Sequence, residues 1–249
     1  MVFFSCLIFW WANISILHNL ARCFKILYIF DFMDFLTVYI DEVGRWPLAG
    51  PVYVWLVAQK KRIVLKGYKD SKKCTPELRE KLYQKMINHK NIYRTTAKCD
   101  HDFIDKQGIS CAIYTSIYKG LEELLMKFVD QEITGLKNIV KHIGKKNIKI
   151  MLDGKYDFKL RAMLGVEVIT VIDGDAKVPQ IGMASILAKV QRDAEMVKYH
   201  KKYPRYRFDQ HKWYGTQLHR DRLAKYGPCR IHRKSYLTKP DNQQPLFQE

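Results

Sequence analysis

Residues 38–47 read VYIDEVGRWP. In this stretch a run of strand-forming residues ends in two adjacent carboxylates, and the other predicted elements are compared with it. Val, Tyr and Ile favour strands, and LTVYI (36–40) is predicted to form a buried one. PVYVWLVAQ (51–59) is predicted as a second strand, joined to the first by a tight turn that contains Gly and Pro. The pair Asp41 and Glu42 therefore lies at the end of a predicted core strand.

The same pattern recurs along the chain. NIKIMLDG (147–154) is predicted as a strand that ends in Asp153, and EVITVIDGDAKV (167–178) repeats the pattern, with Asp173 and Asp175 just past the strand. One more strand is predicted at NIYRTTAKC, and helices are predicted at about 75–89, 109–129, 181–199 and 215–226. The alternation predicts an α/β fold with a mixed β-sheet flanked by helices.

In such sheets, the residues that bind ligands and catalyse reactions lie just beyond the strand ends. If these strand ends lie side by side, four carboxylates converge and raise one another's pKa unless a cation neutralises them. Mg²⁺ or Mn²⁺ prefers oxygen ligands of this kind. The alternative is that each acid is a separate turn residue or helix cap; for a single Asp this is the better expectation, and for Asp41–Glu42 the two are about even.

The charge of the chain points to a polyanionic partner. Lys and Arg total 43 against 25 Asp and Glu, which gives a net charge of +18 and a pI near 9.6. Nucleic acid is the first expectation and an anionic membrane surface the second. The six cysteines are scattered without zinc-site spacing, so free thiols in a reducing cytoplasm are expected.

The N-terminal 33 residues differ from the rest. Residues 2–17 carry no charge, but the run is short for a membrane span, which needs about 20 apolar residues. Three interpretations stay open: a membrane-associating segment, a packed extension, or residues outside the mature protein. We favour the last, with a start near Met33, a catalytic domain over 34–237 and a flexible tail over 238–249.

Several motifs carry a family resemblance. YIDEVGRWPLAGPV, GYKDSKK, FIDKQGISCAIYTSI, IMLDG, GDAKVPQIGMASILAKVQRD, HKWYGTQLH and YGPCRIHRKSY resemble, in order, the motifs of ribonuclease HII. The resemblance covers about residues 34–237. It implies a ribonuclease H-like fold with a small C-terminal helical part, and an endonuclease that cuts RNA in RNA–DNA hybrids and beside single ribonucleotides embedded in duplex DNA.

The resemblance also implies the site residues. The catalytic, metal-binding acids would be Asp41, Glu42, Asp153 and Asp175, where Asp175 is preferred to Asp173 because it precedes AKVP. Mg²⁺ or Mn²⁺ would serve two-metal activation of water for in-line attack at the 5′ side of a ribonucleotide, leaving 5′-phosphate and 3′-hydroxyl ends. The family suggests a monomer.

Substrate contacts follow from the same motifs. Residues that would read the ribose 2′-hydroxyl are Gly44, Arg45, Trp46 and Tyr214, and candidates for phosphate contact are Lys72, Ser185 and Lys189. Three C-terminal histidines, His211, His219 and His232, have no familiar metal-ligand spacing and are expected to be structural or to face phosphate.

Two tryptophans depart from the family. Trp46 and Trp213 stand where the family has glycine, and a large side chain at 46 should block the groove or distort the turn. One interpretation is a translation artefact, in which UGA codons that the source reads as glycine were rendered as tryptophan; Trp55 and the Trp10–Trp11 pair could share this cause. The alternative is a catalytically impaired protein that still binds duplexes.

The tail holds one short motif. Gln243, Leu246 and Phe247 resemble the Gln-x-x-Leu-Phe peptides that dock on replication sliding clamps. Five residues are a short match, so an incidental tail is the other interpretation.

Overall fold

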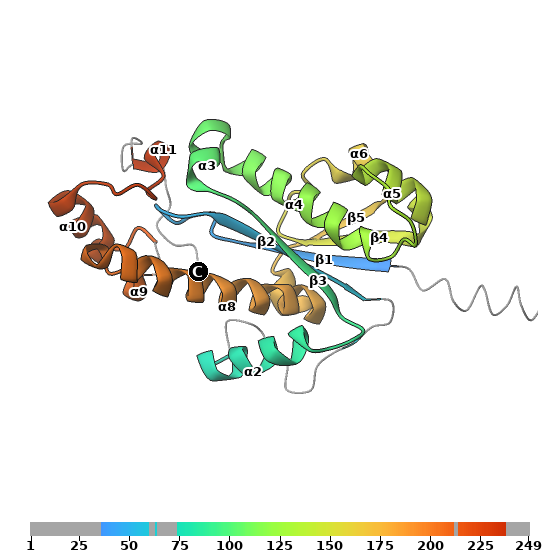
Figure 1. Ribbon diagram of the computed structural model, residues 1–249, viewed down its shortest axis with the longest axis horizontal. Helices are drawn as coiled ribbons and strands as arrows, with labels where there is room; N and C mark the ends of the chain where they lie inside the picture. Colours follow the sequence, from blue (N-terminus) through green and yellow to red (C-terminus); the bar gives the residue numbers. More distant parts are fainter. Residues whose placement is uncertain (1–35, 60–62, 64–73, 212–213, 238–249) are drawn as a thin grey trace, which may run out of the picture. The chain divides into compact units, whose positions relative to one another are not determined.

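The computed structural model describes residues 36–59, 63, 74–211 and 214–237. From Leu36 onward these residues belong to one compact unit. It is built on a five-stranded mixed sheet of order β3-β2-β1-β4-β5 (Figure 1). The strands are β1 (Leu36–Val43), β2 (Val52–Gln59), β3 (Tyr93–Cys99), β4 (Ile148–Asp153) and β5 (Glu167–Val171).

The central strand β1 is antiparallel to β2 and parallel to β4. It continues to Val43, whereas the prediction ended it at residue 40. The reason is that β2 stays apolar along its length and its ladder with β1 runs on to the Val43–Tyr53 pair. Asp41 and Glu42 are therefore residues of the strand itself, and their positions are fixed by the ladder.

Helices cover both faces of the sheet (Figure 1). On one face, α4 (Ile109–Met126) packs with α3 (His101–Gln107), α5 (Leu136–Ile143) and α6 (Leu160–Leu164) against the even-numbered apolar residues of β1 and β2. On the other face, α8 (Pro179–Lys202) and α2 (Pro76–Ile87) pack against Trp55 and Val57. Alternation of side chains along a strand explains why one strand serves both cores.

Local sequence explains where the helices begin. Thr75 caps α2, since its Oγ1 accepts from the Leu78 N–H at 3.3 Å, and Pro76 occupies the first helical position. Thr216 caps α10 (Gln217–Tyr226) in the same way through the His219 N–H, and Gly227 follows its end.

Asp173 and Asp175 lie just past the strand β5 (Glu167–Val171), as predicted. β5 ends at Val171, the chain turns at Asp173 with φ of 56°, and Gly174–Lys177 form the short helix α7. The Asp173–Gly174 pair is a turn signal, because both residue types tolerate a left-handed backbone. Asp175 therefore lies on a helix, not on a strand end.

The C-terminal part is small and helical. It contains α9 (Phe208–His211), α10 and α11 (Lys234–Leu237), with single 3₁₀ turns at Pro204–Tyr206 here and at Lys145–Asn147 before β4. Its core is aromatic and includes Tyr206 and Phe208. Among the described residues, no helix is long and apolar enough to cross a membrane.

Candidate active site

The candidate acids come from three neighbouring elements. Asp41 lies on β1, and its parallel neighbour β4 ends in Asp153 one residue past the Ile40–Leu152 pair. Asp175 lies on α7, which follows β5 on the far side of β4. Asp41 and Asp175 are buried, with 7% and 5% of their surface exposed.

Asp153 is oriented by backbone donors. Its Oδ1 accepts from the Gly154 N–H at 3.0 Å and from the Gly174 N–H at 2.7 Å. Gly174 must be small, because a Cβ there would lie 2.9 Å from Ile181 Cδ1 and 3.0 Å from Asp153 Oδ1. The carboxylate of β4 and the helix that carries Asp175 are thus packed directly together.

The electrostatics show that the acids are grouped. Burial raises the pKa of Asp41 well above its usual value, and the charges of Glu42, Asp153 and Asp175 raise it further, against a hydrogen bond from Ser185 that lowers it. Burial also raises the pKa of Glu42, whereas its ion pair of 3.5 Å with Arg45 lowers this pKa. The structure therefore brings together all four acids that the sequence analysis named.

The donor set suits a hard divalent cation, because it consists of carboxylate oxygens whose mutual repulsion a cation relieves. The grouping is not a complete coordination shell: among the described residues, no three His, Cys, Asp or Glu side chains lie close enough together to hold one ion.

The loop after β1 lies beside this group. Gly44 has φ of +94°, and a Cβ on it would lie 2.9 Å from the carbonyl oxygen of Pro51, so this position requires glycine. The Arg45 guanidinium pairs with Glu42 and lies 5.6 Å from the Trp46 ring and 5.8 Å from the Tyr156 ring.

Trp46 is 64% exposed. Its φ is not positive, so the backbone at this position does not require glycine. The expected distortion of the turn is therefore wrong, whereas obstruction of an incoming duplex stays a prediction. Trp55 is a core residue, and its indole N–H donates to Gln191 Oε1 at 2.6 Å.

Tyr214 is held from two sides. The buried Arg192 guanidinium lies 4.7 Å from its ring and donates to its hydroxyl at 3.2 Å. Its carbonyl oxygen lies 2.9 Å from Nδ1 of His219, whose Nε2 lies 3.0 Å from Nε2 of His232. All three histidines are buried, which supports the structural interpretation over the phosphate-facing one.

The remaining candidate residues for substrate and clamp contact have fewer recorded contacts with the acids. Ser185 lies on α8 and hydrogen-bonds Asp41, so it adjoins the acids. Lys189, one turn later on α8, pairs with Asp193 at 3.7 Å. Lys72, Trp213 and the tail residues Gln243, Leu246 and Phe247 lie outside the described residues.

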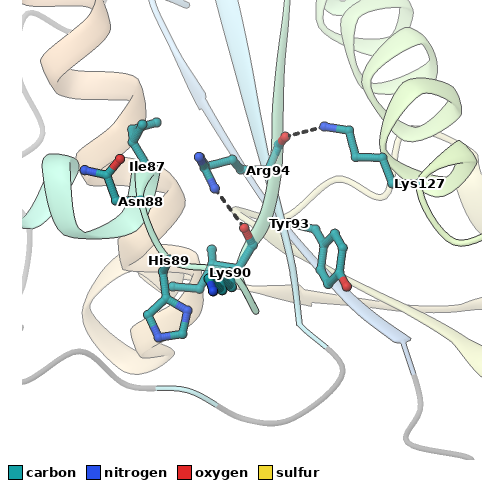
Figure 2. Close-up of a pocket in the computed structure, with 8 residues that line it drawn as sticks. Ile87, Asn88, His89, Lys90, Tyr93, Arg94 and Lys127 are labelled. Atoms are coloured by element: carbon teal, nitrogen blue, oxygen red, sulfur yellow. Dashed lines mark hydrogen bonds between the residues drawn. The ribbon is translucent and has the colours of Figure 1, made fainter.

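An open pocket of about 370 Å³ lies elsewhere (Figure 2). It is lined by the end of α2 and the start of β3, and its basic groups Arg94 and Lys127 donate to the backbone carbonyls of Ile92 and Arg94. Tyr93 is in register with Ala58 and through it with Val38, near the beginning of β1. None of the four acids lines this pocket.

The sequence analysis missed the buried arginines Arg192 and Arg233 and the hydrogen bond between His219 and His232. Burial of an arginine depends on long-range packing, which no local pattern reveals. The only available signal was that Arg233 falls inside the motif YGPCRIHRKSY.

The order of the strands and the flanking helices define the chain as a member of the ribonuclease H-like α/β fold class. It resembles the ribonuclease HII of a PCNA:RNase HII complex from Archaeoglobus fulgidus, with a TM-score of 0.58, 21% identity and coverage of 85% of this chain and 98% of that one. It also resembles ribonuclease H2 from Pyrococcus horikoshii, with a TM-score of 0.57, 24% identity and coverage of 80% and 93%.

The chain belongs to the ribonuclease HII family, whose model matches residues 38–239. Ribonuclease HII from Caldicellulosiruptor bescii is 38% identical over 198 residues, 80% of this chain and 84% of that protein. The Coxiella burnetii enzyme is 35% identical over 208 residues, 84% of this chain and 90% of that protein. The chain is thus a ribonuclease H, an endonuclease that acts on RNA–DNA hybrids, which confirms the family and fold predicted from the motifs.

Proposed function

We propose that the chain hydrolyses the phosphodiester on the 5′ side of a ribonucleotide, both in RNA–DNA hybrids and at single ribonucleotides in duplex DNA. The products carry 5′-phosphate and 3′-hydroxyl ends. The observation that supports this most is the grouping of three carboxylates around Asp41, beside a loop that carries the family's ribose-reading motif. The proposed catalytic domain spans residues 34–237.

Asp41, Glu42, Asp153 and Asp175 would hold the divalent cations, Mg²⁺ or Mn²⁺. A bound cation of this kind lowers the pKa of water and stabilises charge on the leaving oxygen. A ribonuclease HIII from the solved structures is described in complex with Mn²⁺; it has a TM-score of 0.53 and 15% identity and so shows only the shared fold.

The chain's own residues supply orientation. The backbone donors Gly154 and Gly174 fix Asp153, and Arg45 fixes Glu42, so the carboxylates are held in place before substrate arrives. The backbone at Gly44–Trp46 would read the 2′-hydroxyl, with Tyr214 beside it, while Ser185, Lys189 and Lys72 would contact phosphate.

The proposed setting is ribonucleotide repair in the cytoplasm. A sliding clamp is a proposed partner through Gln243, Leu246 and Phe247, supported by the structural neighbour that was solved with PCNA. Deletion of residues 243–247 should abolish clamp pull-down and leave cleavage unchanged; unchanged pull-down would refute this contact.

The test is cleavage of an end-labelled duplex with one embedded ribonucleotide, in Mg²⁺ and in Mn²⁺. We expect one cut on the 5′ side of the ribonucleotide and a 3′-hydroxyl end that a polymerase extends. An otherwise identical all-DNA duplex should stay intact. Cutting on the 3′ side, or equal cutting of both duplexes, would refute the proposal.

A further inference from the structure

Arg233 is a fully buried cation whose side chain donates to three carbonyls of one loop. Its side chain donates to the carbonyl oxygens of Gly44 at 2.7 Å, Gly50 at 2.9 Å and Arg45 at 3.1 Å. Burying a guanidinium is costly unless its donors are satisfied, and burial lowers the pKa of Arg233 to about 10. Three carbonyls of one loop meet this requirement, so the loop and the arginine depend on each other.

The segment that carries Arg233 is itself anchored. Its backbone pairs with the loop, since the Arg233 N–H donates to Leu48 O and the Gly50 N–H donates to Ile231 O, both at 2.8 Å. On its other side, Asp105 of α3 accepts from the backbone N–H groups of Lys234 and Ser235 at 2.9 and 3.0 Å. The helix α3 therefore fixes the segment, and the segment fixes the loop.

Tyr236 contributes a second bond to the same loop. Its hydroxyl donates to the carbonyl oxygen of Arg45 at 3.0 Å, so this oxygen has two donors. The Arg233 guanidinium also lies 5.1 Å from the Tyr236 ring. The orientation of the Arg45–Trp46 peptide is thus determined by two side chains of the C-terminal segment.

The direction of the neighbouring N–H groups follows from peptide geometry. In a trans peptide, the C=O and the following N–H point in opposite directions, and the described residues contain no cis peptide. Since the carbonyls of Gly44 and Arg45 point at Arg233, the N–H groups of Arg45 and Trp46 point away from it. Two backbone donors are thereby presented together on the side of the loop opposite to Arg233.

We propose that Arg233 is a positioning residue for ribose recognition: by holding the carbonyls of Gly44 and Arg45, it aims the N–H groups of Arg45 and Trp46 at the 2′-hydroxyl of the substrate. Tyr236 supports the second peptide. This inference rests on the proposed function of the loop. Lysine cannot replace Arg233, because an ammonium lacks the planar fork that reaches three carbonyls at once.

The test separates ribose recognition from general binding. Two variants, Arg233→Lys and Tyr236→Phe, are compared with the wild type for kcat and KM on the one-ribonucleotide duplex. Their Kd values are measured in EDTA for that duplex and for the all-DNA duplex. Tyr206→Phe is the matched control, because it also removes a tyrosine hydroxyl that donates to a backbone carbonyl, but this carbonyl is that of Gly227, at 2.7 Å, and not one of the loop.

We expect Tyr236→Phe to reduce kcat about fivefold, because one hydrogen bond is lost. The preference for the ribonucleotide, which is the ratio of the Kd for the all-DNA duplex to the Kd for the one-ribonucleotide duplex, should fall by about the same factor. Arg233→Lys should reduce them about 10²-fold, the usual cost of misplaced reacting groups. In both variants the Kd for all-DNA duplex should stay within about twofold, the range left when no contact to this duplex is lost, and Tyr206→Phe should match the wild type in every assay.

The inference is overturned if both variants keep the wild-type preference, if they weaken binding to the two duplexes equally, or if Tyr206→Phe has the same effect. If Arg233→Lys does not fold, Tyr236→Phe decides by itself. A wild type without any preference for the ribonucleotide duplex would instead refute the proposed function, and the inference would fall with it.

Discussion

At the residue scale, the site concentrates negative charge where burial makes charge costly. Asp41 is buried on the central strand, and each of three other carboxylates raises its pKa. Groups held at such a cost are typical of functional sites, where stability is lost in exchange for chemistry. Arg45 supplies one compensating charge among the described residues, through its ion pair with Glu42.

Asp41→Asn should therefore stabilise the protein while it removes activity. A raised pKa in the folded state means that ionisation at pH 7 favours unfolding, so the neutral amide should increase the free energy of unfolding in EDTA by about 1 kcal/mol or more. Urea denaturation at pH 7 measures this. Mg²⁺ should raise the Tm of the wild type and not that of the variant; a variant that is less stable than the wild type in EDTA would contradict the argument.

Trp46→Gly tests the substitution that sets this chain apart from its family. The exposed indole lies beside Arg45 on the loop proposed to approach the ribose. Its removal should raise kcat/KM on the one-ribonucleotide duplex about tenfold or more, because backbone can then approach the ligand. Steady-state kinetics of both proteins gives the answer, and equal values would refute the steric argument. UGG codons at positions 46 and 213 would refute the misread-codon explanation.

At the element scale, the site is made by register and by one turn. The parallel pairing of β1 and β4 sets Asp41 beside Asp153, and the turn at Asp173 brings Asp175 onto α7. Gly174 allows α7 to approach Asp153 closely. Change in any of these elements would separate acids that are more than 100 residues apart in sequence.

Also at the element scale, a series of hydrogen bonds through His232 and His219 holds the backbone of Tyr214. The Cys229 N–H donates to Nδ1 of His232 at 2.9 Å, so the neutral ring carries its proton on Nε2 and donates to Nε2 of His219. Nδ1 of His219 then donates to the Tyr214 carbonyl. Nδ1 of His232 also lies 3.3 Å from the Cys229 carbonyl oxygen; a further proton on this nitrogen would end its role as acceptor for the Cys229 N–H.

This arrangement predicts a loss of stability in acid. Burial lowers the pKa of His232 to about 4 from an ordinary value near 6.5, so the unfolded chain binds more protons between these values. Stability from His232 is present above pH 6.5 and is lost as the pH falls towards 4. From pH 7 to pH 5, the wild type should lose about 2 kcal/mol more than His232→Asn.

Urea denaturation of both proteins at the two pH values measures this difference. Parallel losses in the wild type and in His232→Asn would show that His232 does not titrate in this way.

The sequence predicted the elements better than their ends. Runs of strand-forming residues placed all five strands, and the helix starts predicted at about 75 and 215 lie within two residues of those observed. Asp41 and Glu42 were predicted at a strand end, but pairing with β2 extends β1 through both residues; the short helix α7 after the Asp173–Gly174 turn was not predicted. The burial of Arg192, Arg233 and the histidines could not be predicted, because it depends on contacts between distant segments.

At the scale of the whole molecule, an acidic site lies in a chain of net charge +18. In the proposed function, the acids serve the chemistry, whereas the excess of Lys and Arg attracts the nucleic-acid backbone. Buried arginines join the C-terminal part to the rest: Arg192 of α8 donates to the Tyr214 hydroxyl, and Arg233 donates to the loop after β1. The two parts therefore act as one unit.

The charge predicts a strong dependence on salt. Binding of the all-DNA duplex should weaken by about 10²-fold between about 50 and about 200 mM NaCl, because bound phosphates release counterions. Fluorescence anisotropy at several salt concentrations measures the slope. Preference for the ribonucleotide duplex should change little, since it depends on hydrogen bonds; a flat salt response would contradict an electrostatic footprint.

The most direct test of the central claim, that acids from three elements form one cation site, compares two neighbouring aspartates. Asp175 is buried beside Asp41, whereas Asp173, two residues earlier, is exposed and pairs with Lys177 at 3.7 Å. The measurement is the cleavage rate of the one-ribonucleotide duplex against Mn²⁺ concentration for the wild type, Asp175→Asn and Asp173→Asn. We predict that Asp175→Asn loses at least about 10²-fold in rate and requires more Mn²⁺, while Asp173→Asn follows the wild type. Equal effects of the two substitutions, or full activity of Asp175→Asn, would contradict the account.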